Sequence, residues 1–199
     1  MEQFNNNMSE SYPAIYQNAR SARENRMQIA QTLTQDIILQ NESFQALGQV
    51  NDKKIHSRIS WAIDLAIELS PDLFLDRLPF LINEIKRWTD QSSLRSLLRA
   101  CVHLIEYDDN IAQPLLPEKL KKTLIEPCFD LLLSQHPVAV KVHAMQLLFD
   151  LKELQPWVEE ALIIDLKNNI KWLNYSNEHH IQSVLSQDFF HNLLVLLDT

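Results

Sequence analysis

The chain has 199 residues, a formal net charge of −8 and a single glycine, Gly48. The near absence of glycine argues against phosphate-cradling loops, dinucleotide-binding turns and most β-sandwiches, because their turns need glycine for positive φ or close ligand approach. The charge is −1 in residues 1–100 and −7 in residues 101–199, which argues against nucleic-acid binding as the main role, since such binders usually present a basic surface.

The first residues differ in composition from the rest of the chain. Residues 1–11 are polar and contain an asparagine triplet, so we expect a flexible tail, followed by a single domain over residues 12–199. From Pro13 the pattern becomes helical. Arg20, Arg23 and Arg26 lie roughly on one helical face, which indicates a solvated surface or, alternatively, a local contact with an anion.

Apolar residues at helical spacing predict about four helical hairpins. In the first hairpin we expect one helix over 33–47 that ends at Gly48, and a second over 52–70 that begins at the N-cap Asp52. Pro79 and Pro127 each fall inside the first helix of a later hairpin and should kink it. The remaining helices are expected over 71–88, 94–107, from 117 onward, and over 137–151, 156–173 and 178–197.

A short pattern recurs in the second helices, in which a basic residue is followed three positions later by a residue that faces a packed partner. The three pairs are Arg58 with Trp61, Arg95 with Leu98, and Lys141 with Ala144. Successive basic residues are 37 and 46 residues apart. Two-helix units of roughly 40 residues are typical of HEAT and armadillo repeats. The sequence therefore predicts an all-α fold, an α-solenoid with the right-handed superhelix of those repeats and a concave face that binds a partner.

Two tracts resemble known HEAT sequences. Residues 138–145, VAVKVHAM, are similar to the HEAT consensus in which an apolar residue, a basic residue, two variable residues and alanine open the second helix, and residues 125–130, IEPCFD, precede them. Residues 44–170 resemble a family of small, uncharacterised bacterial HEAT-like proteins. Its pattern matches at Arg58, Trp61, Asp64, Arg95 and Lys141.

The resemblance has departures and a consequence for activity. Pro127 stands where the family usually has a small helix former, and Leu131 where it usually has tryptophan. Some members of the family carry the label adenylosuccinate lyase. The glycine- and serine-rich catalytic loop of the lyase superfamily has no counterpart in this chain, so we expect no enzymatic activity.

Other residue types give no chemical site. Cys101 and Cys128 lie in apolar helical runs and are expected to be buried free thiols. His179 and His180 are adjacent, so they would point about 100° apart on a helix and could not bind one ion. We therefore expect no catalytic, cofactor or metal site. With no targeting segment and no long apolar run, we expect a cytoplasmic protein without membrane contact.

Acidic residues close three second helices, at Glu68, Glu106 and Asp150. Carboxylates at a helix C-terminus oppose the helix dipole. We expect a basic partner from the neighbouring repeat at each position; the alternative is an acidic rim that faces a ligand.

Basic residues gather at the start of the second helices, namely Lys54, Arg58, Arg95, Arg99 and Lys141. We expect Arg58, Arg95 and Lys141 to form a ladder between repeats in which Asp52 and Asp90 accept their bonds. Lys54 and Arg99 have no such partner in this interpretation. They are therefore expected to be available to a partner molecule.

The functional prediction is a non-catalytic helical-repeat scaffold that binds a protein or peptide, with an acidic segment, on its concave face. Trp61 could anchor the partner. The expected partner-binding residues are Lys54, Arg58, Trp61, Arg95 and Arg99. The alternative is recognition of nucleic acid or a modified base, as in some DNA-repair glycosylases with this fold.

Overall fold

The computed structural model describes residues 12–17, 19 and 22–175, with the side chains of Leu166 and residues 168–175 excepted. Every regular element within these residues is helical, so the prediction of an all-α fold is confirmed there. The tail expected over residues 1–11 and the helix expected over 178–197 lie outside the described residues.

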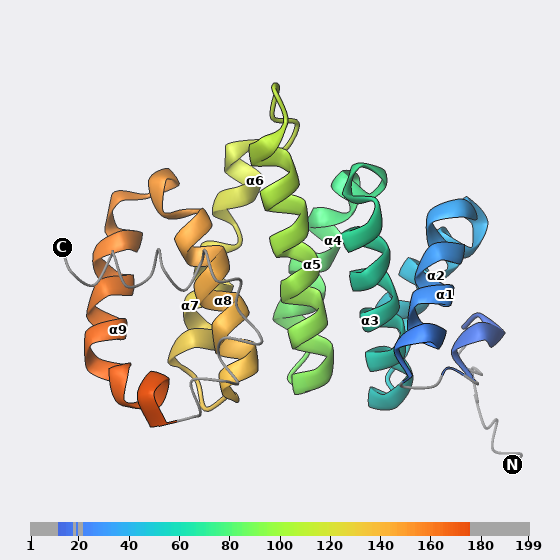
Figure 1. Cartoon of the computed structure of the whole chain (residues 1–199), viewed down its shortest axis with the longest axis horizontal. Coiled ribbons are helices and arrows are strands. Elements are labelled where there is room, and N and C mark those ends of the chain that lie inside the picture. Colours follow the sequence, from blue (N-terminus) through green and yellow to red (C-terminus); the bar gives the residue numbers. More distant parts are fainter. Residues whose placement is uncertain (1–11, 18, 20–21, 176–199) are drawn as a thin grey trace, which may run out of the picture.

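Five long helices form a row in chain order (Figure 1). Each packs on the next, so that α1 contacts α3, α3 contacts α5, α5 contacts α8 and α8 contacts α9. The row consists of α1 (Arg23–Gln35), α3 (Lys53–Leu69), α5 (Gln91–Asn110), α8 (Val138–Asp150) and α9 (Pro156–Tyr175).

The remaining helices form a second layer against this row. α2 packs on α3, α4 on α5 and α7 on α8, so each of these three helices contacts the helix of the row that follows it. These elements are α2 (Ile37–Gln49), α4 (Leu78–Arg87), α6 (Glu118–Lys122) and α7 (Ile125–Leu133), with the 3-10 segments η1 (Ala14–Tyr16), η2 (Pro71–Arg77) and η3 (Lys152–Leu154).

One continuous apolar core lies between the two layers. Its central side chains are fully buried leucines and isoleucines at helical spacing, contributed by both layers. They include Ile59, Ile63 and Ile67 of α3, Leu78 and Leu81 of α4, and Leu94, Leu97 and Leu98 of α5. Burial of these side chains is the main driving force for packing the helices together.

Aspartate N-caps fix the starts of two long helices. Asp52 Oδ1 accepts a hydrogen bond from the backbone N–H of Ile55 at 2.9 Å, as expected for the start of α3. Asp90 Oδ2 accepts from both the N–H and the Oγ of Ser93, at 2.9 and 3.0 Å, and opens α5. Each bond satisfies a donor that has no partner inside the helix.

The helix predicted over 33–47 corresponds to α2 (Ile37–Gln49), so both predicted ends are wrong. Leu33 belongs to α1, and the chain breaks at Asp36, whose side chain caps α2. Gly48 lies inside α2 and does not cap it. A Cβ at Gly48 would lie 3.3 Å from Phe80 Cε2, so glycine here permits the close approach of Phe80 on α4.

Pro79 and Pro127 were predicted to kink the middle of a helix, but both lie in the first turns of helices. Pro79 lies in the first turn of α4, directly after η2. Pro127 lies in the first turn of α7, after α6 has ended at Lys122. Proline is tolerated there because a first-turn N–H has no intrahelical acceptor to lose.

Candidate basic pocket

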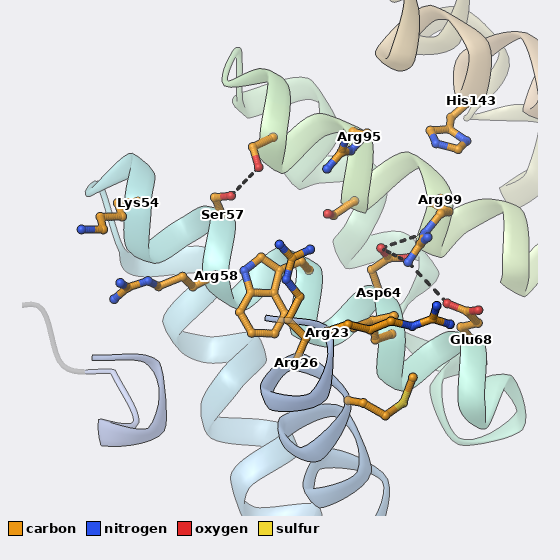
Figure 2. A pocket seen from close by; sticks show the side chains of 15 residues that line it. Arg23, Arg26, Lys54, Ser57, Arg58, Asp64, Glu68, Arg95, Arg99 and His143 are labelled. Atoms are coloured by element: carbon orange, nitrogen blue, oxygen red, sulfur yellow. Dashed lines mark hydrogen bonds and ion pairs between the residues drawn. The ribbon is translucent and has the colours of Figure 1, made fainter. Parts of the chain in front are cut away.

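A pocket rich in charged side chains lies over α1, α3 and α5 (Figure 2). Its volume is about 730 Å³. It is lined by Arg23, Arg26, Met27, Lys54, Ser57, Arg58, Trp61, Asp64, Leu65, Glu68, Ser92, Arg95, Ser96, Arg99 and His143. We call this the basic pocket.

All five residues expected to bind a partner line the basic pocket. Lys54, Arg58 and Trp61 come from α3, and Arg95 and Arg99 come from α5. They are brought together because α3 and α5 pack side by side and present the same turns on the same side. The five residues therefore lie on one surface. Their role in binding stays a prediction.

The charge of the basic pocket is opposite to that of the chain. Six cationic side chains line it, those of Arg23, Arg26, Lys54, Arg58, Arg95 and Arg99, against the two carboxylates Asp64 and Glu68. The whole chain carries −8. Such a local excess of positive charge attracts anionic groups to this surface.

Arg99 is paired, so the expectation that it lacks a structural partner is wrong. Its Nε donates to both oxygens of Asp64 at 2.9 Å, and its Nη2 lies 2.8 Å from Asp64 Oδ2 and 3.4 Å from Glu68 Oε2. Burial raises the pKa of the Asp64 carboxyl to about 7, although the charge and hydrogen bonds of Arg99 oppose that rise. The pair joins α3 to α5 and holds the Arg99 guanidinium at the pocket wall.

The predicted ladder is also wrong. Arg58 Nη1 donates to the backbone carbonyls of Tyr16 and Gln17, at 2.9 and 2.8 Å. Asp52 and Asp90 accept bonds from their own helices, because the N-cap geometry places their oxygens over the first backbone N–H groups. Arg58 instead fastens the segment before α1 to α3.

Lys54 and Arg95 are two cations of the basic pocket that could pair with a partner, and Arg23 is likewise exposed. Lys54 and Arg95 are both exposed, and neither makes a hydrogen bond or ion pair with another described residue. Lys141, expected in the ladder, likewise has none within the described part of the chain, and it does not line the basic pocket. The availability of Lys54 to a partner molecule stays a prediction. Arg95, expected in the ladder, has no such bond within the described residues, whereas Arg99, expected to be available, is paired.

Several lining residues were not predicted for this site, among them Arg23, Arg26, Asp64 and His143. Arg23 and Arg26 of α1 line the basic pocket, and the Arg26 guanidinium lies 5.3 Å from the centre of the Trp61 ring. The helical spacing of these two arginines indicated a common face, which we interpreted as a solvated surface or a local contact with an anion. Asp64 and His143 carried no signal of a ligand site, because their placement depends on the packing of α5 against α3 and α8.

The three helix-closing acids have different environments. Glu68 has the basic partner expected from the next unit, Arg99. Glu106 accepts a hydrogen bond from Gln146 Nε2 at 2.9 Å, from a neutral partner, and Asp150 Oδ2 is buried without a hydrogen bond to any described residue. Burial and the charges of Glu106 and Asp109 raise the pKa of Asp150 to about 7. The prediction of a basic partner is thus confirmed only for Glu68.

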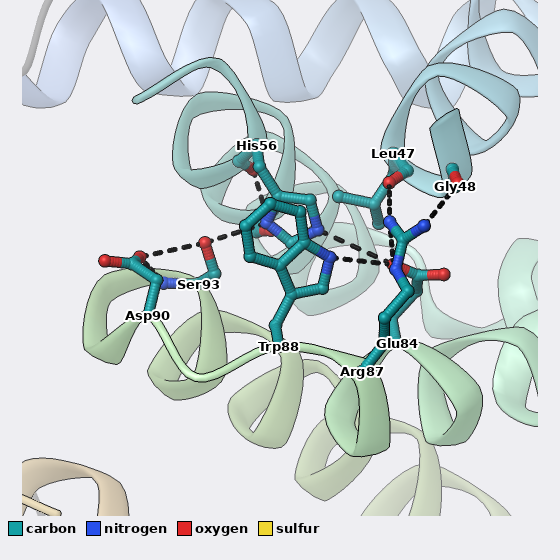
Figure 3. Close-up of polar contacts among 9 residues, drawn as sticks. Leu47, Gly48, His56, Glu84, Arg87, Trp88, Asp90 and Ser93 are labelled. Carbon is teal, nitrogen blue, oxygen red and sulfur yellow. Dashed lines mark hydrogen bonds and ion pairs between the residues drawn. The ribbon is translucent and has the colours of Figure 1, made fainter. Parts of the chain in front are cut away.

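A second polar cluster, which we call the His56 junction, joins α3, α4 and α5 (Figure 3). His56 Nδ1 lies 2.8 Å from Ser93 Oγ, its Nε2 lies 3.6 Å from Glu84 Oε2, and its ring stacks on Trp88 with centroids 3.6 Å apart. Burial lowers the pKa of His56, although Glu84 opposes the shift.

The order of groups in the His56 junction, serine, histidine and carboxylate, is that of a nucleophilic triad. However, His56 and Ser93 are both 0% exposed, so no substrate can reach Ser93 Oγ. The junction therefore holds three helices together and is not a candidate for catalysis.

Comparisons with known proteins identify no relative: no protein-family model, curated protein or solved structure matches this chain. No described helix combines the length and the apolar character needed to cross a bilayer. The described residues also contain no cluster of three or more histidine, cysteine or acidic side chains suited to a metal ion. His179 and His180 lie outside the described residues.

Proposed function

We propose that this chain is a non-catalytic HEAT-like α-solenoid that binds an acidic segment of a protein or peptide in the basic pocket. The observation that carries the proposal is the concentration of six cations against two carboxylates at one pocket of a chain with net charge −8. Cationic surfaces of this kind select anionic partners by electrostatic complementarity.

The packing order of the long helices supports the solenoid. α1, α3, α5, α8 and α9 contact one another in chain order, as the units of a repeat protein contact only their neighbours. The right-handed superhelix and the concavity of the α1–α3–α5 face belong to the proposal.

In this proposal, cations that are hydrogen-bonded within the chain have a different role from cations that are not. Arg58 and Arg99 are held by hydrogen bonds to Tyr16, Gln17 and Asp64, so they present positive charge in a fixed place. Lys54 and Arg95 have no such bonds and can form ion pairs with carboxylates of the bound segment. Trp61, with Arg26 beside its ring, offers an aromatic surface to an apolar side chain of the partner.

The test compares two double charge reversals that change the net charge by the same amount. We expect Lys54→Glu with Arg95→Glu to weaken binding of a fluorescent glutamate-rich peptide by at least about tenfold. The control is Lys86→Glu with Lys119→Glu, two exposed lysines outside the basic pocket, which should leave the affinity nearly unchanged. Arg99 is left intact, because its loss would strand the buried Asp64 carboxyl.

Two results would contradict the proposed function. One is an absence of saturable peptide binding at low salt by the wild-type chain. The other is an equal loss of affinity in both double variants, which would show that only overall charge matters. Melting curves of each variant establish that it is folded.

A second candidate is binding of single-stranded or flipped bases, favoured by one observation, the position of Trp61 among the pocket cations. Bases stack on aromatic side chains while cations neutralise the phosphates. The carboxylates Asp64 and Glu68 in the same pocket, and the net charge of −8, favour the peptide. Retention of DNA on filters at about 50 mM salt would support this candidate, and no retention would eliminate it.

A further inference from the structure

One end of the basic pocket contains a buried imidazole nitrogen without a partner. His143 of α8 lines the pocket but is only 4% exposed. Its Nδ1 makes no hydrogen bond with any described residue. A buried polar atom in that state is unusual in a folded protein and calls for an explanation, of which a missing ligand is one.

Two arginines line the same pocket as His143, and the charges of both act on its imidazole. Figure 2 shows His143 on the same side as Arg95 and Arg99 of the neighbouring helix α5. Arg95 has no hydrogen bond or ion pair with a described residue. Arg99 uses Nε and Nη2 on Asp64 and Glu68, which leaves Nη1 outside those bonds.

The electrostatics of His143 agree with this arrangement. Burial, followed by the positive charges of Arg99 and Arg95 and by His103, lowers the pKa of His143 to about 4. The imidazole is therefore neutral at pH 7 and carries one N–H donor. Arg99 shares its charge with Asp64 and Glu68, whereas Arg95 has no carboxylate partner among the described residues and leaves positive charge at this end of the pocket.

We propose that Arg95, Arg99 and His143 form a subsite for a phosphoryl group, carried by a phosphorylated residue of the bound acidic segment. This inference rests on the proposed function and specifies its partner. A phosphoryl group brings nearly two negative charges and three acceptor oxygens. Two guanidinium groups and one imidazole N–H supply donors for these oxygens, whereas a carboxylate offers one charge and two oxygens.

The subsite is tested first with inorganic phosphate and NMR of the histidine rings at pH 7.5. We expect a saturable shift of the His143 resonance, assigned by its loss in His143→Gln. Acetate at matched ionic strength should bind at least about tenfold more weakly. Arg95→Gln should weaken phosphate binding by a similar factor, because it removes one of the two guanidinium groups.

The matched control is Lys54→Gln, which removes a pocket cation outside the proposed subsite and should leave phosphate binding within about twofold. Because Arg95 is exposed, Arg95→Gln is expected to fold even if His143→Gln does not. Absence of a saturable phosphate response, an equal response to acetate, or unchanged phosphate affinity in Arg95→Gln would each overturn the inference.

The source of the phosphoryl group is tested with three further probes, namely a glutamate-rich peptide with a central phosphoserine, the same peptide with serine there, and adenosine monophosphate. We expect the phosphopeptide to bind most tightly, with the gain lost in Arg95→Gln. Equal binding of both peptides would refute the subsite and leave the proposed function standing. Phosphate binding without binding of either peptide would refute the proposed function and the peptide source together, and tighter binding of the nucleotide would refute the peptide source alone.

Discussion

Asp150 shows how a single carboxyl links stability to pH. It closes α8, its Oδ2 is buried without a hydrogen bond to a described residue, and Glu106 and Asp109 are nearby. Its pKa rises from 3.8 to about 7 in the folded chain, so the folded state holds a proton that the unfolded state has released. Below about pH 4 the carboxyl is protonated in both states, and its contribution to stability is fully present. The free energy of unfolding then falls as the pH rises from about 4 through about 7.

We predict that Asp150→Asn stabilises the chain at pH 8 by about 1–3 kcal/mol, because the amide resembles the protonated acid and never ionises. The difference from the wild type should vanish near pH 4. Urea unfolding at both pH values measures it. Asp130→Asn, at an exposed position on α7, is the control and should have little effect. A destabilised Asp150→Asn at pH 8 would mean that the charged carboxylate is favourably paired.

At the scale of elements, the His56 junction is expected to hold α4 on α3 and α5. Glu84 is 6% exposed, accepts a hydrogen bond from Trp88 Nε1 at 3.2 Å and forms an ion pair with Arg87, whose Nη2 lies 2.7 Å from Glu84 Oε2. Arg87 in turn donates to the carbonyls of Leu47 and Gly48 on α2. His56 Nε2 of α3 lies 3.6 Å from Glu84 Oε2, so this carboxylate also connects the second layer with the row of long helices.

Glu84→Ala should lower the free energy of unfolding by about 2–4 kcal/mol, since it leaves buried donors without an acceptor and opens a cavity. Glu42→Ala, on the exposed side of α2, is the matched control, with an expected change below about 0.5 kcal/mol. Denaturant unfolding of both variants decides the point. Equal effects would show that the junction contributes nothing specific.

Element boundaries could be predicted where the cause is local. The cap at Asp52 follows from side-chain chemistry within one turn, and so does the placement of Pro79 and Pro127 at helix starts. The start of α5 was predicted at Leu94, three residues after the helix begins at Gln91. The break at Asp36 was missed, because the apolar residues on both sides of it continue at helical spacing. The role of Gly48 was missed because it depends on Phe80, which is far away in sequence.

The candidate site could be predicted only in part. The helical register places Lys54, Arg58, Trp61, Arg95 and Arg99 on one surface, and this much follows from the spacing. The spacing does not show which of these cations have partners, because Arg99 pairs with Asp64 across the contact between two helices. The buried His143 lies on a third helix, and its exposure depends on how α8 packs against α5.

At the scale of the molecule, a row in which each helix contacts its neighbours predicts uneven local stability. Leu162 of α9 is fully buried at one end of the described row, where α9 packs on α8. We predict that Leu162→Ala lowers the protection of α9 amides from hydrogen exchange by about 2–4 kcal/mol while α3 and α5 keep theirs.

The control for this prediction is Ile164→Ala on the same helix, where the side chain is 53% exposed. It should leave exchange nearly unchanged. A uniform loss of protection across α3, α5 and α9 in Leu162→Ala would show a single cooperative unit. That result would argue against the solenoid.

The central claim is that an acidic segment lies in the basic pocket, and lysine acetylation followed by mass spectrometry tests it most directly. Lys54 lines the pocket, whereas Lys86 and Lys119 are exposed elsewhere. With saturating glutamate-rich peptide, we predict that acetylation of Lys54 slows by at least about fivefold and that Lys86 and Lys119 react as in the unbound chain. Unchanged reactivity of Lys54, or protection of Lys86 or Lys119 in its place, would contradict the claim.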